Sequence, residues 1–283
     1  MTRVPPAVVP PPRPAVPPIG LVAVDLDGTL LTDQKQIGKR TARALASLPA
    51  RGVKVVIASA RPPRSVRTVY ELLGLDTWQI NYNGALIWDH PGLAVVHHQP
   101  MPAELVAVIV NRARQVYPDC LVSCEILDKW FTDRFDQTYT TETGRMFDPD
   151  LVAPLWMFLS QPVTKLMLLG PSWMMDDLAG LVAAEFPMVN VVRSDPELIQ
   201  ITDAAVSKGA ALHYVADAYG VPMSRVMAIG DETNDLEMLQ AAGVAVAVGN
   251  AHSKVKEVAH WVAPSNNDHG VHAALVRFGL VDK

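Results

Sequence analysis

The sequence predicts an α/β fold in which a parallel sheet is covered by helices on both faces and interrupted by an inserted α+β domain. Short apolar runs rich in β-branched residues alternate with stretches of helical period near both ends of the chain, a pattern typical of βαβ units. Between about residues 88 and 203 this pattern gives way to hairpin-like runs and longer helical stretches. We therefore expect a core of residues 19–87 and 204–283 and an inserted domain of residues 88–203.

The first part of the predicted core contains three strands and two helices. Residues 19–25 form a continuous apolar run, which indicates a strand buried on both faces, as in parallel sheets. Further buried runs, and apolar residues at helical spacing, define the next elements. These are a helix at 38–48, a strand at 53–58, a helix at 66–73 and a strand at 79–87.

The inserted domain and the C-terminal part follow from the same criteria. Residues 122–131 contain two short apolar runs around a polar pair, which predicts a β-hairpin. The other elements predicted in this domain are helices at 104–116 and 174–185 and strands at 164–169 and 189–193. The alternating pattern then returns, with helices at 209–219 and 236–242 and strands at 226–229 and 244–248.

Composition narrows the classes of function. The chain has 283 residues, of which 49% are apolar and 19% are charged, so it has ample material for a packed core. A net charge of −5 opposes a general nucleic-acid binder, which would show a basic stripe, but it leaves small phosphorylated ligands open. No apolar stretch reaches the roughly 18 residues of a membrane helix. We therefore expect neither a nucleic-acid polymer nor a membrane as partner.

The cysteines and the N-terminal segment indicate the cellular compartment in which the protein is expected. On one strand Cys120 and Cys124 would lie roughly 13 Å apart, beyond the roughly 7 Å between Cα atoms that a disulfide allows. Two small buried thiols fit a reducing cytoplasm, so a cytoplasmic protein is expected. Residues 1–18 are rich in proline and lack the apolar segment of a signal peptide, so we expect an extended or disordered tail.

Two acids follow the first predicted strand, in the sequence Asp25-Leu26-Asp27-Gly28-Thr29. In open parallel sheets ligands bind beyond the carboxyl ends of the strands, so both carboxylates can face one pocket. Acids this close repel each other, and a bound divalent cation such as Mg²⁺ removes the conflict. The alternative is a simple turn with an N-cap, since Asp and Gly are common there.

Further polar groups follow other predicted strands. Asp231 and Asp235 can face one pocket if a helix begins at Thr233, although capping of that helix is an alternative explanation. Ser59 can hold a phosphate oxygen, but serine is also a common turn residue. Lys208 lies at the start of a predicted helix, where a lysine is unfavourable unless it serves an anion, and a solvated surface lysine is the alternative.

The sequence, with an acid pair, a serine, a lysine and a second acid pair in that order, resembles the haloacid dehalogenase (HAD) superfamily. It resembles in particular the Cof-type, class IIB sugar-phosphate phosphatases. The stretch from Asp25 to Leu31 resembles the first family motif and Ser59 the second. Lys208 resembles the third, and Gly230 to Asp235 the fourth. Residues 83–85, 248–251 and 267–271 are also similar to Cof-type sequence.

The resemblance implies a Rossmann-like core and a cap, the inserted domain, that contributes substrate specificity. It implies that Asp25 is the nucleophile and that Asp27 is the general acid and base. It assigns Mg²⁺ to Asp25, to Asp231 and to Asp27, the last through its backbone carbonyl. Ser59, Lys208 and Asn234 would bind the phosphate, and Asp235 and Thr29 would support the site.

The implied function is that of a Mg²⁺-dependent phosphatase, which hydrolyses a small phosphorylated metabolite through an aspartyl-phosphate intermediate. The physical chemistry agrees, because phosphoryl transfer needs charge neutralisation and in-line positioning above all. A phosphomutase can use the same residues. A non-enzymatic phospho-ligand binding or signalling protein is the alternative of another class, although signalling receivers are much shorter. The sequence predicts neither the substrate nor the oligomeric state.

Overall fold

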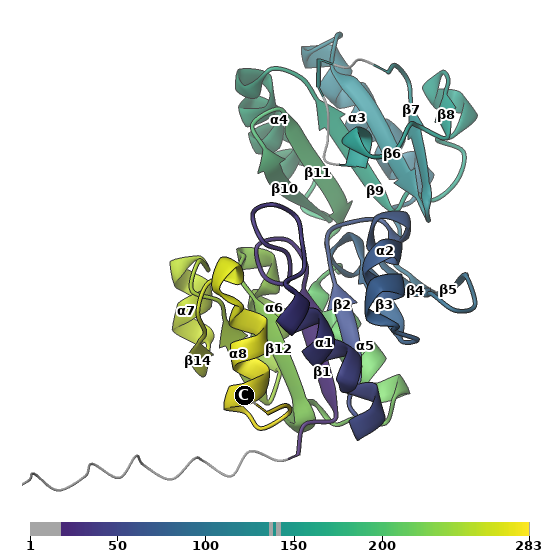
Figure 1. Cartoon of the computed structure of the whole chain (residues 1–283). Coiled ribbons are helices and arrows are strands. Elements are labelled where there is room, and N and C mark those ends of the chain that lie inside the picture. The colour runs from purple at the N-terminus through teal and green to yellow at the C-terminus, as the bar shows by residue number, and fades with distance from the viewer. Residues whose placement is uncertain (1–17, 136–137, 140–142, 283) are drawn as a thin grey trace, which may run out of the picture.

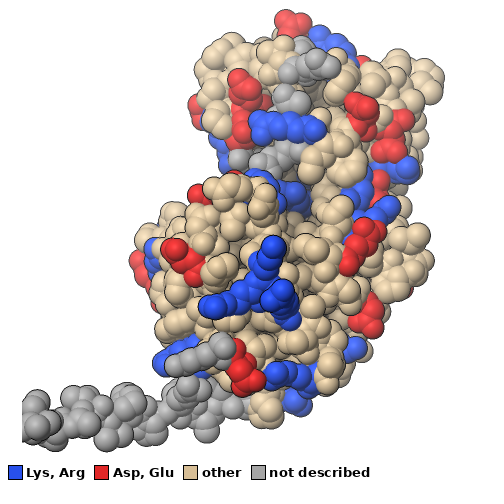
Figure 2. All heavy atoms as spheres, in the orientation of Figure 1, with Lys and Arg blue, Asp and Glu red and all other residues tan. Residues whose placement is uncertain are grey.

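The computed structural model describes residues 18–135, 138–139 and 143–282. It contains two β-sheets with packed helices, which form a lower and an upper unit joined at a narrow waist (Figures 1 and 2). Acidic and basic side chains are interspersed over the face that Figure 2 shows, and several basic side chains gather near the centre of the lower unit. Of the predicted tail, residues 1–18, only Pro18 is described, and its carbonyl accepts a hydrogen bond from Arg225.

The larger sheet lies in the lower unit. Its strands are β1 (Leu21–Asp25), β2 (Lys54–Ala58), β3 (Trp78–Asn81), β4 (Leu86–Asp89), β5 (Ala94–His98), β12 (Val226–Gly230), β13 (Val244–Ala247) and β14 (Trp261–Val262). The spatial order is β14-β13-β12-β1-β2-β3-β4-β5. Neighbours from β14 to β3 are parallel, and β4 and β5 add an antiparallel edge.

Helices cover both faces of this sheet, as predicted. They are α1 (Lys39–Ser47), α2 (Pro63–Leu73), α5 (Lys208–Ala218), α6 (Leu236–Ala241), α7 (Ser253–Val258) and α8 (Gly270–Arg277). Helix α1 contacts α2 and α8 on one face, and α5 contacts α6 on the other. Side chains such as Val22, Val56 and Ile229 are completely buried between these layers and form the main hydrophobic core.

The predicted strand at 79–87 is wrong as a single strand. Tyr82, Asn83 and Gly84 have φ values of 50°, 59° and 107°, so the chain turns between β3 and β4, which then pair antiparallel. Glycine is required at Gly84, because a Cβ there would lie 2.3 Å from the Ser207 carbonyl oxygen. Short 3₁₀ turns lie at Pro49–Arg51, Tyr82–Gly84, Thr143–Arg145, Leu155–Met157, Met223–Arg225, Thr233–Asp235 and Asn266–Asp268.

The smaller sheet lies in the upper unit. Its strands are β6 (Leu121–Ile126), β7 (Lys129–Thr132), β8 (Leu151–Val152), β9 (Lys165–Leu169), β10 (Val189–Asp195) and β11 (Leu198–Asp203), and its helices are α3 (Ala103–Val116) and α4 (Ser172–Glu185). The order is β10-β11-β9-β6-β7-β8, antiparallel except between β7 and β8. The predicted hairpin is confirmed as β6 and β7. Cys120 and Cys124 are free and buried, as expected.

The strands of the smaller sheet all lie between residues 121 and 203, whereas β5, at 94–98, pairs within the larger sheet. The division of the chain at residues 88 and 203 stays a prediction. Within the described ranges, no helix is both long and apolar enough to cross a membrane.

Candidate active site

The residues singled out in the sequence lie along one edge of the larger sheet. Asp25 is the last residue of β1, and the strand register pairs it with Ala58, the last residue of β2. On its other side β1 pairs with β12, which ends at Gly230. Ser59 and Asp231 therefore follow neighbouring strands at the same edge, where the carboxyl ends of parallel strands meet.

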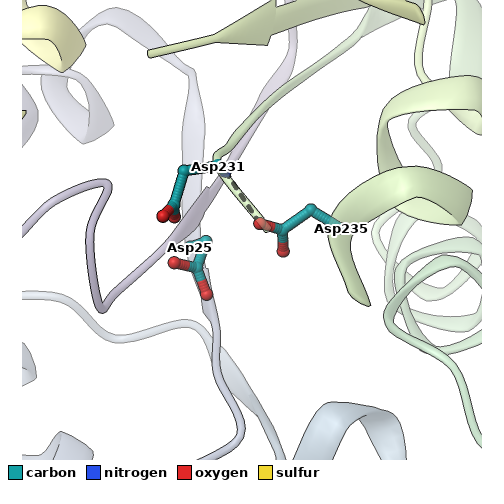
Figure 3. Close-up of side chains that lie close together, drawn as sticks. All are labelled: Asp25, Asp231 and Asp235. Carbon is teal, nitrogen blue, oxygen red and sulfur yellow. Dashed lines mark hydrogen bonds between the residues drawn. The ribbon is translucent and has the colours of Figure 1, made fainter. Parts of the chain in front are cut away.

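Three buried carboxylates, those of Asp25, Asp231 and Asp235, converge at this edge (Figure 3). One oxygen of each lies within 4.8 Å of the others. Burial raises the pKa of Asp231 to about 6, although a hydrogen bond of 2.6 Å from the Thr29 hydroxyl opposes the rise and the Asp235 carboxylate adds to it. Acids this close are stable as carboxylates only when cations lie beside them.

The backbone around these acids donates hydrogen bonds to one of them and leaves space for another. Asp235 Oδ2 accepts hydrogen bonds from the backbone N–H groups of Asp231, at 2.9 Å, and Glu232, at 3.1 Å. Gly28 has a φ of 79°, and a Cβ at this position would lie 2.3 Å from Asp231 Oδ2. Glycine therefore serves both the turn after β1 and the close approach of the Asp231 carboxylate.

Lys208 supplies a cation to this cluster. Its side chain is 1% exposed, and Nζ lies 2.5 Å from Asp25 Oδ1 and 2.7 Å from Asp235 Oδ1. Burial would lower the pKa of Lys208, but the two carboxylates outweigh it and raise the pKa. Burial also raises the pKa of Asp25 well above its ordinary value, and Lys208 counteracts this. The alternative of a solvated surface lysine is therefore wrong.

Asp27 lies apart from the cluster. Its carboxylate is 36% exposed and receives two hydrogen bonds of 2.6 Å from the Arg61 guanidinium and one of 2.8 Å from Lys35 Nζ. Burial raises the pKa of Asp27, but the two cations outweigh it, so the pKa is lowered. The sequence reasoning gave Arg61 and Lys35 no role. The place of Arg61 two residues after Ser59 was the available signal for the first, and no local signal marked the second.

Ser59 and Asn234 are joined through Asn83. The Ser59 side chain is buried, its hydroxyl accepts the backbone N–H of Arg61 at 3.1 Å, and its carbonyl accepts the N–H of Asn83 at 3.0 Å. The Asn234 amide donates to Asn83 Oδ1 at 2.9 Å, and Asn234 Oδ1 is buried without a hydrogen-bond partner. A buried orphan of this kind indicates a place for a ligand or an ordered water.

The donor set fits a hard divalent cation. Carboxylate and carbonyl oxygens are the ligands that Mg²⁺ prefers. Asp25 and Asp231 offer buried carboxylates, and the missing Cβ of Gly28 leaves room beside Asp231. The Asn250 amide donates to the Gly28 carbonyl at 2.7 Å and so fixes the loop after β1. The structure brings together the carboxylates of Asp25, Asp231 and Asp235 with Lys208, and Ser59 follows a neighbouring strand at the same edge. The Asp27 side chain is not part of this cluster, and the individual roles of all these residues stay predictions.

Comparisons with known proteins agree with this arrangement. The 5-amino-6-(5-phospho-D-ribitylamino)uracil phosphatase YitU of Bacillus subtilis is 31% identical over 89% of this chain and 94% of its own. BT1666 of Bacteroides thetaiotaomicron, described among phosphatases of the HAD superfamily, has a TM-score of 0.80 and 27% identity, over 95% of this chain and 98% of its own. The HAD subclass IIB sugar phosphatase BT4131 has a TM-score of 0.75 over 92% of this chain and 99% of its own. At 20% identity, this last likeness shows the fold alone.

The family model of haloacid dehalogenase-like hydrolases matches residues 22–275, which include both units and every residue of the site. The acids at the ends of β1 and β12 lie within this match, as does the buried Lys208 that joins Asp25 to Asp235. The chain belongs to the haloacid dehalogenase-like hydrolase family and is a phosphoric monoester hydrolase of the HAD phosphatase type.

Proposed function

We propose that this phosphatase hydrolyses a small phosphorylated metabolite with the help of Mg²⁺, through an aspartyl-phosphate formed on Asp25. The observation that carries the proposal is the contact of Asp25 with Lys208, beside the carboxylate of Asp231. A buried nucleophile next to a fixed ammonium and a cation-binding carboxylate suits the transfer of an anionic phosphoryl group.

In the first step a carboxylate oxygen of Asp25 forms a bond to phosphorus while the bond from phosphorus to the ester oxygen breaks. Asp27 donates a proton to the departing oxygen. In the second step Asp27, now a carboxylate, accepts a proton from the water that attacks phosphorus and releases Asp25. Arg61 and Lys35 favour the carboxylate form of Asp27, so Asp27 must take up a proton from solvent before the first step. We expect the anionic substrate to compete for these two cations and thereby to allow this protonation.

Mg²⁺ would be held by the carboxylates of Asp25 and Asp231 and by the backbone carbonyl of Asp27, and when bound it would offset negative charge on the phosphoryl oxygens. Lys208 holds one oxygen of Asp25 in place. Ser59 and Asn234 would orient the phosphate group. The hydrogen bond from Lys208 to Asp235 supports a role of Asp235 in holding the lysine at the edge of the sheet.

The substrate class rests on YitU, which is 31% identical to this chain. The name of YitU specifies a phosphorylated ribityl compound. We infer that this chain also acts on a phosphomonoester of a sugar or similar small metabolite. The cap, predicted as residues 88–203, would set the choice among them, because the core residues named above would contact only the phosphate group.

The test is phosphate release from a panel of sugar phosphates, nucleotides, flavin mononucleotide and pyridoxal phosphate, with Mg²⁺ or EDTA. We expect Mg²⁺-dependent release that is lost in Asp25→Asn and kept in Asp76→Asn, which removes an exposed carboxylate away from the site. Undiminished release by Asp25→Asn would refute the proposed nucleophile. Conversion of a sugar phosphate to its isomer without free phosphate would identify a mutase instead.

A further inference from the structure

The turn between β6 and β7 in the upper unit reaches the first turn of α2 in the lower unit. Asp128, in this turn, accepts a hydrogen bond from the backbone N–H of Arg64 at 2.9 Å. The N-cap residue of α2 is Pro62, which makes no side-chain capping bond of its own. Asp128 therefore caps a helix of the other unit, and its negative charge lies at the positive end of that helix.

Side chains reinforce this contact. The Arg64 guanidinium binds both carboxylate oxygens of Glu125, at 2.9 and 2.8 Å, and Glu125 is 1% exposed. The Tyr82 hydroxyl lies 3.1 Å from Glu125 Oε2 and 2.8 Å from the carbonyl oxygen of Leu127. We call Arg64, Tyr82, Glu125 and Asp128 the joint between the two units.

The joint is connected stiffly to the loop that carries Ser59. Only four residues separate Ser59 from Arg64, and two of them, Pro62 and Pro63, have fixed φ angles. A second connection runs through the turn after β3, where the backbone N–H of Tyr82 donates to the Arg61 carbonyl at 3.3 Å. The joint is therefore linked to the loop on both sides.

From these contacts we infer that Asp128 is a positioning residue: by capping α2 from the upper unit it fixes the Ser59 loop for phosphate binding. The kinetic test of this inference rests on the proposed function. The hydrogen-exchange test rests on the structure alone. Asp128 touches neither the three-carboxylate cluster nor Lys208 in the described part of the chain, so it acts only through α2.

The kinetic test compares Asp128→Ala, Asp128→Asn and Asp150→Ala with the wild type, using p-nitrophenyl phosphate with Mg²⁺. Asp150 is a matched control, because both of its hydrogen bonds, from Lys129 Nζ and from the backbone N–H of Trp130, lie within the upper unit. We expect the KM of Asp128→Ala to rise by up to about tenfold, which is the change in equilibrium constant that corresponds to the stability usually lost with a helix cap. Asp128→Asn, which keeps a capping oxygen, should stay within about threefold of wild type.

A merely structural role would lower the active fraction, and hence kcat, in Asp128→Ala while KM stayed the same. An unchanged KM, or an equal rise in Asp150→Ala, would overturn the inference. Inorganic phosphate as a competitive inhibitor gives a second binding measure, and its inhibition constant should rise in parallel with KM.

Hydrogen exchange on the intact chain tests the joint even if no substrate is turned over. Backbone amides in the first turn of α2 should exchange about tenfold faster in Asp128→Ala than in wild type or Asp150→Ala. Unchanged exchange there would refute the inference whatever the kinetics. Faster exchange in Asp128→Ala, combined with a wild-type chain that releases no phosphate from any substrate, would instead count against the proposed function alone.

Discussion

Replacing Lys165 by methionine should stabilise the protein at neutral pH. The Lys165 side chain lies at the start of β9 and is 5% exposed, with Nζ 4.9 Å from the centre of the Tyr82 ring. Among the described residues its ammonium makes no ion pair within 4.0 Å. Burial lowers the pKa of Lys165 from 10.5 to about 8, although the charge of Glu125 opposes this and that of Arg64 adds to it.

The magnitude follows from this difference in pKa. A pKa of about 8 in the folded chain, against 10.5 in the unfolded chain, means that the charged form costs roughly 3 kcal/mol on folding. Between pH 8 and 10.5 the unfolded chain binds a proton that the folded chain does not, so the free energy of unfolding rises with pH in this window. The cost is fully present below pH 8 and absent above 10.5.

The assay is urea unfolding of wild type, Lys165→Met and Lys129→Met at pH 7 and pH 10, followed by tryptophan fluorescence. We expect Lys165→Met to be more stable by up to about 3 kcal/mol at pH 7, a midpoint shift of roughly 1 M urea. At pH 10 the gain should fall below about 1 kcal/mol. Lys129→Met, which loses an exposed pair with Asp150, should change by less than about 1 kcal/mol at both values.

Two results would refute this reasoning. If Lys165→Met were less stable than wild type at pH 7, the ammonium would contribute more through its neighbours than its burial costs. If the difference between the two proteins were the same at pH 7 and pH 10, titration of Lys165 would not be its source.

Two further changes test the site. Lys208→Met leaves two buried carboxylates without their ammonium, so it should cost roughly 3–5 kcal/mol in urea unfolding at pH 7 and abolish phosphate release; wild-type stability would contradict this. Gly28→Ala places a Cβ 2.3 Å from Asp231 Oδ2, so the Mg²⁺ concentration for half-maximal release should rise at least about tenfold. Gly52→Ala, with φ of 75° and no atom within 4 Å, should cost about 1–2 kcal/mol of stability and leave that concentration unchanged.

The sequence was most informative where one strong physical constraint acted locally. A strand buried on both faces must be apolar throughout, so the run at 19–25 predicted β1 almost to the residue. The same criterion failed at 79–87, where apolar flanks concealed the turn signal Asn83-Gly84. Strands β5 and β14 were not predicted, because the apolar run of the first stops at Val96 before His97-His98 and the second has only two residues.

The site shows a similar limit. The acids and the serine that directly follow buried strands identified the edge of the sheet where the site lies. They did so because the carboxyl ends of parallel strands lie at the same edge. The sequence carried no sign of which cation each acid would meet. Asp27 binds Arg61, 34 residues away, because β1 and β2 are neighbours in the larger sheet. Arg64 binds Glu125, 61 residues away, because the two units pack against each other. Local periodicity contains no information of this kind.

The pairing of β1 has a consequence for how the chain folds. Leu21 pairs with Lys54 on one side but with Val226 on the other, so the central strand of the larger sheet waits for most of the chain to be synthesised. The smaller sheet draws its strands from residues 121–203 alone and can form earlier. Sheets with distant pairings form slowly, and an apolar strand with an open edge invites association with other chains. The edge of the larger sheet that carries the three buried carboxylates is thus completed late. Until then β1 is the segment that most needs protection from aggregation.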